Sequence, residues 1–241
     1  MLVDVHAHLT YEKFDENVDE VINKFKGIII TNGTFVEDNR KVLKLSKKYS
    51  NVKPALGIYP GHIIEMSDDE LKKELKFIEE NKPIAIGEVG LDGTYENMDK
   101  QIIWFKEFIK LSNKLEIPII VHTRKAEAKV IDVLEEMKAK KVVLHCFSGN
   151  MKLVVRAEKL GYNFSVPVII TYLEHFKELV KKVSITKLLT ETDAPFLSNI
   201  KGERNEPKNV TITIKEIAKL KNMVEIEVEN SILMNYKRLF N

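Results

Sequence analysis

The chain has 241 residues, of which 44% are hydrophobic and 31% are charged. This length and composition fit a single globular domain over residues 1–241 that buries a full core, so a second domain is not needed. The 38 basic and 36 acidic residues leave a formal net charge of +2. The surface therefore lacks the excess of positive charge that attracts polyanions at long range, and a nucleic acid would have to be bound locally.

Cysteine content and hydropathy indicate in which cellular compartment the protein is expected. Cys146 is the only cysteine, which excludes an internal disulfide and a structural zinc knuckle and agrees with a reducing compartment. The longest apolar stretches, such as residues 27–30 and 118–121, are far shorter than the roughly 20 residues that span a bilayer. The N-terminus also lacks the pattern of a secretory signal. We therefore expect a cytoplasmic protein with no membrane segment and no obligatory protein partner.

Short runs with strand character alternate with longer amphipathic patterns along the whole chain. In chain order, the predicted strands occupy residues 2–5, 27–31, 52–58, 83–88, 118–122, 142–147, 162–166 and 187–191. The predicted helices occupy residues 16–26, 37–50, 68–80, 98–115, 125–138, 151–160, 172–183, 211–221 and 225–239. Most of the strand runs are apolar at consecutive positions, which is typical of strands buried on both faces.

Eight strand and helix units in this length predict an α/β fold, a (β/α)8 TIM barrel. An open doubly wound sheet is the alternative, but no glycine-rich dinucleotide-binding turn follows the first strand. The loop at residues 194–209, after the eighth strand, contains Pro195, Gly202 and Pro207, and we interpret it as an active-site lid.

Side chains of the kinds that bind metal ions lie at or just beyond the ends of five of the predicted strands. They are His6, His8, Glu88, His122, His145 and Asp193. His6 and His8 are two residues apart and point the same way if the first strand continues through them. In a parallel barrel the carboxyl ends of all strands meet at one face. Imidazoles and carboxylates gathered there predict a two-metal hydrolytic centre for zinc, manganese or magnesium.

Each of these residues, taken alone, has a simpler structural interpretation. His122 and His145 could be strand-end histidines with satisfied hydrogen bonds, Glu88 could lie on the surface, and Asp193 could initiate a turn before Pro195. The combination of four imidazoles and two acids at the ends of strands one, four, five, six and eight favours metal binding.

The predicted centre suits a phosphodiester. Two divalent cations, two carboxylates and a bridging hydroxide leave a charge of about +1, which a phosphodiester monoanion balances. Asp193 could accept the proton of the attacking water. Arg124 and Arg204 are candidate phosphate clamps because a guanidinium matches two phosphate oxygens. Ser148 and Asn205 could add hydrogen bonds, and His62 could reach the substrate as an acid or donor.

The motifs resemble those of the TatD-type metal-dependent deoxyribonucleases, a branch of the amidohydrolase superfamily. The resemblance rests on DVHAH at 4–8, GEVGLD at 87–92, VHTR at 121–124, HCFSG at 145–149, LTETDAP at 189–195 and RNEP at 204–207, in the order of the family. It implies a barrel hydrolase in which His6, His8 and Asp193 bind one metal, His122 and His145 bind the other, and Glu88 lies between them.

The sequence departs from this family at two places. Relatives usually read GIHPH after the third strand, whereas this chain reads GIYPGH, so Tyr59 replaces a histidine and His62 is displaced by one residue. After GLD, relatives usually carry an aromatic residue, whereas Gly93 follows here and Tyr95 comes two residues later. These departures bear on how a base or sugar is held.

The resemblance and the residues together predict a metal-dependent phosphodiesterase, a nuclease that trims DNA or RNA from an end. A small-molecule amide or ester hydrolase on the same barrel is one alternative, but it would more typically carry a carboxylated lysine in place of Glu88. A non-catalytic scaffold derived from such an enzyme is the other, and it would have lost at least one ligand.

Overall fold

The computed structural model describes residues 1–241. Eight parallel strands form one sheet in sequence order, as the alternation predicted. They are β1 (Leu2–Ala7), β2 (Gly27–Asn32), β3 (Val52–Leu56), β4 (Ala85–Gly90), β5 (Ile119–His122), β6 (Val142–His145), β7 (Asn163–Val166) and β8 (Leu188–Thr190). Short turns of 3-10 helix occur at η1 (Glu12–Phe14), η2 (Val168–Thr171), η3 (Ile185–Lys187) and η4 (Pro207–Asn209).

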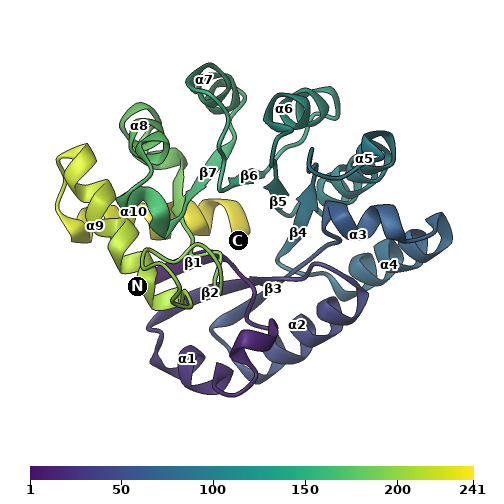
Figure 1. Cartoon of the computed structure of the whole chain (residues 1–241), viewed down its shortest axis with the longest axis horizontal. Coiled ribbons are helices and arrows are strands. Elements are labelled where there is room, and N and C mark those ends of the chain that lie inside the picture. Colours follow the sequence, from purple (N-terminus) through teal and green to yellow (C-terminus); the bar gives the residue numbers. More distant parts are fainter.

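The helices surround the strands, as Figure 1 shows. They are α1 (Val18–Lys24), α2 (Val36–Lys48), α3 (Pro60–Glu65), α4 (Asp68–Asn81), α5 (Met98–Leu115), α6 (Glu127–Glu136), α7 (Met151–Lys159), α8 (Glu174–Lys182), α9 (Val210–Lys221) and α10 (Glu225–Phe240). The (β/α)8 barrel is therefore confirmed. None of these helices combines the length and the apolar character that crossing a membrane requires.

The last and first strands close the barrel through a seam rather than a regular ladder. The Thr190 hydroxyl donates to the Val3 carbonyl at 2.5 Å, and the Asp193 N–H donates to the His6 carbonyl at 2.8 Å. An isolated parallel bridge pairs Ala7 with Ala194. The segment after β8 is thereby fixed against the carboxyl end of β1.

Packing between the strands and helices follows from the sequence pattern. Most strand residues are buried at consecutive positions, so both faces of the sheet are covered. On α5, the side chains of Phe105, Phe108 and Ile109 are fully buried and belong to the main hydrophobic cluster. Most strand residues are apolar, and the polar side chains at the carboxyl ends of β1, β4, β5 and β6, among them His6, Glu88, His122 and His145, lie at one rim of the barrel.

Candidate metal centre

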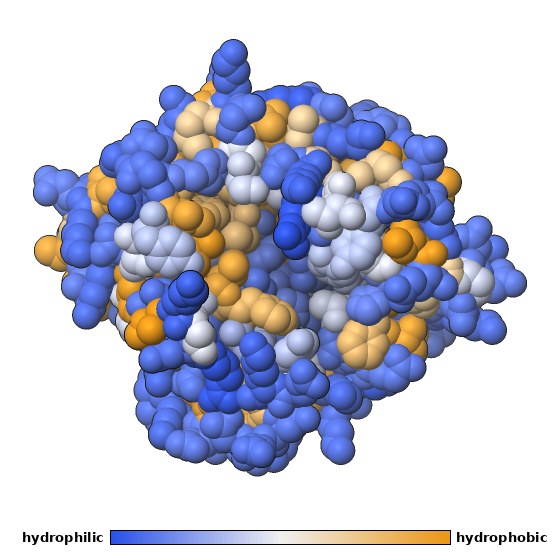
Figure 2. All heavy atoms as spheres, viewed as in Figure 1, coloured by the Kyte–Doolittle hydropathy of each residue, from blue (hydrophilic) through white to orange (hydrophobic).

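The six predicted ligands come together at the carboxyl ends of the strands. His6 and His8 lie at the end of β1, Glu88 lies in β4, and His122 and His145 end β5 and β6. Five of the six line one pocket of about 690 Å³, and the sixth, His6, is fully buried beside it. Figure 2 shows a hollow in the middle of this face with hydrophilic residues at its floor.

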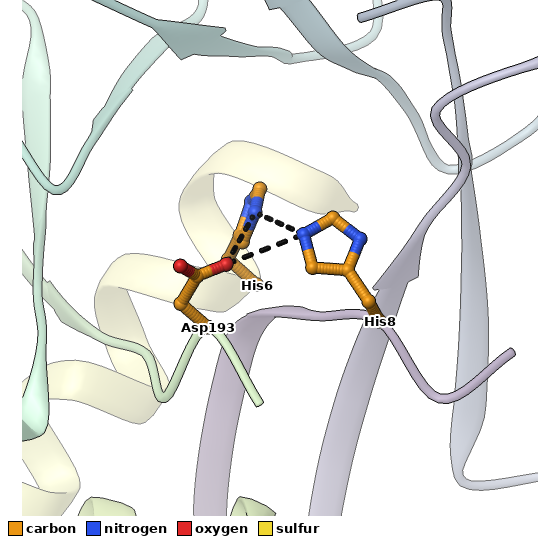
Figure 3. A group of neighbouring side chains, drawn as sticks. All are labelled: His6, His8 and Asp193. Atoms are coloured by element: carbon orange, nitrogen blue, oxygen red, sulfur yellow. Dashed lines mark hydrogen bonds and ion pairs between the residues drawn. The ribbon is translucent and has the colours of Figure 1, made fainter. Parts of the chain in front are cut away.

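The first group of ligands consists of His6, His8 and Asp193 (Figure 3). The two histidine Nε2 atoms lie 3.1 Å apart, and the Asp193 Oδ1 atom lies 3.4 Å from His6 Nε2 and 3.2 Å from His8 Nε2. Ligand atoms at zinc bond lengths in a tetrahedral site are about 3.3 Å from one another. The three atoms therefore have the spacing of a divalent cation site.

Glu88 lies between this group and the other two histidines. Its Oε2 atom is 3.5 Å from the Nε2 atoms of His6 and His8, while its Oε1 atom is 2.8 Å from His122 Nδ1 and 4.0 Å from His145 Nε2. Ligand atoms of His6, Glu88 and His145 also form a candidate metal group. The two oxygens of one carboxylate thus face two separate pairs of imidazoles.

Hydrogen bonds behind the site determine which nitrogen of each imidazole faces it. His8 Nδ1 lies 3.1 Å from the Asn32 carbonyl oxygen, His145 Nδ1 lies 2.8 Å from Glu191 Oε2, and His122 Nε2 lies 3.0 Å from Asp92 Oδ2. These oxygens accept hydrogen bonds, so the bonded nitrogen carries the proton. In the neutral ring the other nitrogen then presents a lone pair to the pocket, as metal binding requires.

Two carboxylates in this outer layer, Asp92 and Glu191, were missed by the sequence reasoning. Asp92 is buried and also accepts a hydrogen bond from the Tyr59 hydroxyl at 2.6 Å. Glu191 is fully buried and accepts from the Ser165 hydroxyl and the Cys146 N–H. Both lie inside the quoted motifs GEVGLD and LTETDAP. Their position in those motifs was the available signal.

We expect Glu191→Gln to weaken metal binding or activity by about 10- to 100-fold, the usual effect of losing a carboxylate partner of a ligating histidine. The glutamine cannot accept all three hydrogen bonds that Glu191 receives, so the His145 ring loses its fixed orientation. Metal titration by calorimetry would measure this, with Ser165→Ala as a control that removes another partner of the same carboxylate. Equal affinities for wild type and Glu191→Gln would show that His145 needs no such support.

The local backbone explains how two of the ligands reach the site. Gly90 has φ +146°, and a Cβ atom there would lie 2.1 Å from the His122 carbonyl oxygen. Only glycine lets β4 approach β5 so closely, which brings Glu88 beside His122. Asp193 has φ 56°, in the left-handed region that aspartate tolerates better than most residues.

Two opposing effects determine the ionisation of the site: burial favours the neutral form of each side chain, and close pairing of carboxylates with imidazoles favours the charged forms. Burial favours the neutral acid, but hydrogen bonds from His122 and His6 hold the pKa of Glu88 well below its usual value. The pKa of Asp193 is likewise lowered despite burial, because His6 and His8 donate to it. Burial opposes charge on His122, yet Asp92 and Glu88 raise its pKa to about 9. In the absence of cations, carboxylates paired with imidazolium ions are the stable form.

The five predicted substrate-binding residues have different surroundings. Arg124 and His62 line the pocket, and the exposed Arg124 side chain makes no ion pair or hydrogen bond. The other three, Arg204, Ser148 and Asn205, do not line it. Ser148 is exposed and donates to Glu127 Oε1 at 2.8 Å.

Arg204 and Asn205 have structural partners instead. The Arg204 guanidinium donates to the Lys13 carbonyl at 2.6 Å and to Glu206 Oε1 at 2.7 Å. Asn205 is fully buried, and its amide donates to the Thr192 carbonyl at 2.7 Å. These bonds and one to Asn17 engage three of the five N–H donors of Arg204, so its predicted role as a phosphate clamp stays a prediction that only the remaining donors could serve. Both residues fix the loop after β8, whose Phe196 and Leu197 form part of the pocket wall.

Comparisons with known proteins show which family the chain resembles. The family model described as TatD related DNase matches residues 3–241. An uncharacterised metal-dependent hydrolase of Methanocaldococcus jannaschii is 38% identical over 99% of this chain and 96% of its own length. The human deoxyribonuclease TATDN3 is 34% identical over 99% of this chain and 94% of its own length.

A solved structure extends the likeness to three dimensions. The crystal structure of a TatD homologue from Escherichia coli superposes with a TM-score of 0.93 at 28% identity, covering 100% of this chain and 98% of that one. The family model spans almost every residue, including all six predicted ligands. The chain therefore belongs to the TatD related DNase family.

Proposed function

We propose that this protein is a two-metal phosphodiesterase that removes nucleotides from the ends of DNA or RNA strands. One observation carries the proposal: the two oxygens of Glu88 face two separate pairs of imidazoles. A carboxylate in that position suits a pair of cations better than a single ion. The family match and the name of the human relative, a deoxyribonuclease, support a nucleic acid as the substrate.

The donor set limits which ions would fit. His6, His8 and Asp193 would hold one cation, His122 and His145 the other, with Glu88 shared. Sites rich in imidazole suit zinc or manganese, and the carboxylates also tolerate magnesium. When bound, such cations supply Lewis-acid polarisation of a phosphoryl oxygen and activate a water molecule at neutral pH.

The side chains of the pocket would divide the remaining tasks. Asp193 Oδ1 faces His6 and His8, while its second oxygen is not engaged by them, so it is available to accept the proton of the attacking water. Arg124 lines the same pocket with its guanidinium free, and it would bind the phosphate through two N–H groups. His62 lines the wall and would contact the substrate beyond the phosphate.

An aromatic pair at the pocket offers a surface for a nucleobase. Tyr11 and Phe196 line the pocket, are 39% and 38% exposed, and meet edge to face with ring centroids 5.1 Å apart. Bases of single strands stack on such exposed rings whatever their sequence. The pair therefore supports binding of an unpaired strand end.

The test is to incubate the purified protein with labelled single-stranded DNA, RNA and a panel of small esters, each with manganese, magnesium or zinc and with a chelator. The proposal requires metal-dependent loss of nucleotides from strand ends. Cleavage confined to the esters would favour a small-molecule hydrolase. No metal-dependent cleavage of any substrate would favour a non-catalytic protein.

We expect Phe196→Ala to raise the KM for single-stranded DNA by about 5- to 150-fold, because stacking on an aromatic side chain contributes about 1–3 kcal/mol per base. Steady-state kinetics on an oligonucleotide would measure the change. Phe196→Trp is the matched control because it keeps a flat ring and should stay near the wild-type value. An unaltered KM in Phe196→Ala would assign base contact elsewhere.

A further inference from the structure

The metal pocket continues into two grooves on either side of α2. The first, here called the α1–α2 groove, has a volume of about 340 Å³ and contains Lys41, Lys44, Lys48, Asp15 and Asp19. Thr10 and Lys41 line both this groove and the metal pocket. The groove therefore adjoins the metal pocket, and a strand whose end lies at the metal centre could extend towards it.

The second, here called the α2–α4 groove, has a volume of about 550 Å³ and joins the pocket through Phe35 and His62. Its charged residues are Glu37, Glu65, Glu70 and Glu74 with Arg40 and Lys73. Four carboxylates face two cations, so the groove has a net charge of −2 with His62 neutral. Because Arg40 is paired with Glu74, Lys73 is the only cation left without an ion pair.

The α1–α2 groove has the opposite balance. Three lysines face two aspartates, so its net charge is +1. Lys48 is paired with Asp19 at 2.6 Å, whereas the exposed side chains of Lys41 and Lys44 make no ion pair. The protein as a whole is nearly neutral, so this local difference decides which groove attracts a polyanion.

The two lysines without an ion pair are also correctly spaced to contact the phosphate backbone of a nucleic acid. Lys41 and Lys44 are three residues apart on α2, so their Cβ atoms are about 5–6 Å apart on one face of the helix. Flexible side chains on that spacing can reach successive phosphates of an extended strand. Lys41, at the boundary with the metal pocket, would contact the phosphate nearer the reacting bond.

We propose that the substrate strand leaves the metal centre through the α1–α2 groove, with Lys41 and Lys44 neutralising its first phosphates beyond the cleaved bond. This inference rests on the proposed function and adds the path of the strand. The α2–α4 groove, lined mainly by carboxylates, repels the same backbone and is left free.

The test compares three charge reversals on exposed lysines: Lys44→Glu in the α1–α2 groove, Lys73→Glu in the α2–α4 groove, and Lys47→Glu, which lies on α2 outside both grooves. The measured quantity is kcat/KM for a single-stranded 12-nucleotide DNA divided by kcat/KM for bis(4-nitrophenyl) phosphate, which has one phosphate only. We expect this ratio to fall about five- to tenfold in Lys44→Glu and to stay near the wild-type value in the other two variants.

The salt dependence provides a second readout. The contacts of Lys41 and Lys44 with a single strand should together add about 1.4 to the slope of log KM against log salt concentration, so Lys44→Glu should lower that slope by about 0.7. A ratio lowered by Lys73→Glu instead, or equally by Lys44→Glu and Lys47→Glu, would overturn the proposed path. Wild-type cleavage of the small diester alone would refute the strand path but retain a phosphodiesterase, whereas cleavage of neither substrate would refute the proposed function itself.

Discussion

Replacing Glu88 with alanine is expected to lower kcat for phosphodiester hydrolysis by at least about 10³-fold, because both proposed cations would lose a shared ligand and cation stabilisation of the transition state amounts to several kcal/mol. Glu88→Gln should be nearly as damaging, since the amide is neutral and can donate as well as accept a hydrogen bond. Single-turnover kinetics at saturating manganese would measure the loss, and metal analysis would count the bound ions.

Two comparisons keep this prediction specific. Glu80→Gln, on the surface of α4, removes the same charge far from the pocket and should keep normal activity. The thermal midpoint of each variant in the presence of chelator reports whether it folds. Near-normal turnover in a folded Glu88→Ala variant would contradict the bridging role of this carboxylate.

Removing the metal is expected to lower the thermal midpoint, and the loss should grow as the pH rises from about 6.5 to 9. Without cations, burial opposes charge on His122, but Asp92 and Glu88 raise its pKa to about 9. A raised histidine pKa stabilises the folded state fully below the unfolded value of about 6.5, and this contribution is lost as the pH passes 9. The metal-free protein should therefore be least stable at high pH.

Metal binding depends on pH in the opposite direction. The raised pKa values of His6, His8 and His122 mean that cations must displace protons from these imidazoles. Apparent affinity should increase about tenfold per pH unit for each proton displaced, and for the proton of His122 this increase should end near pH 9. Calorimetry in two buffers of different ionisation enthalpy would count the released protons. An affinity independent of pH would mean that the imidazoles are neutral before the metal binds.

The fold was predictable because the strands are apolar at consecutive positions and the helices have one apolar stripe. The predicted strands one and four ended at residues 5 and 88, whereas β1 and β4 continue to Ala7 and Gly90. The reason is that both strands run on past a polar residue, His6 or Glu88, next to which the pairing with the neighbouring strand shifts register. The six residues of α3 were missed because so short a helix shows no stripe.

The gathering of the six candidate ligands was predictable because parallel strands end at one rim of the barrel, so residues at those ends must lie close together. The roles of the residues around the candidate ligands were not predictable, because those roles depend on neighbours distant in sequence. Arg204 has the same side chain as Arg124, but it donates to the Lys13 carbonyl, 191 residues away. Glu191 precedes a ligand by two residues, and only the structure shows that it bonds to His145.

The seam between β8 and β1 gives the metal centre a role in holding the chain together. His6 and His8 belong to the first strand and Asp193 follows the last, so an ion bound by all three would link the beginning of the barrel to its end. A crosslink that spans so much of the sequence removes much of the conformational freedom of the open chain. Metal binding would then hold the first and last strands together, and the barrel would open most easily at this seam once the metal is removed.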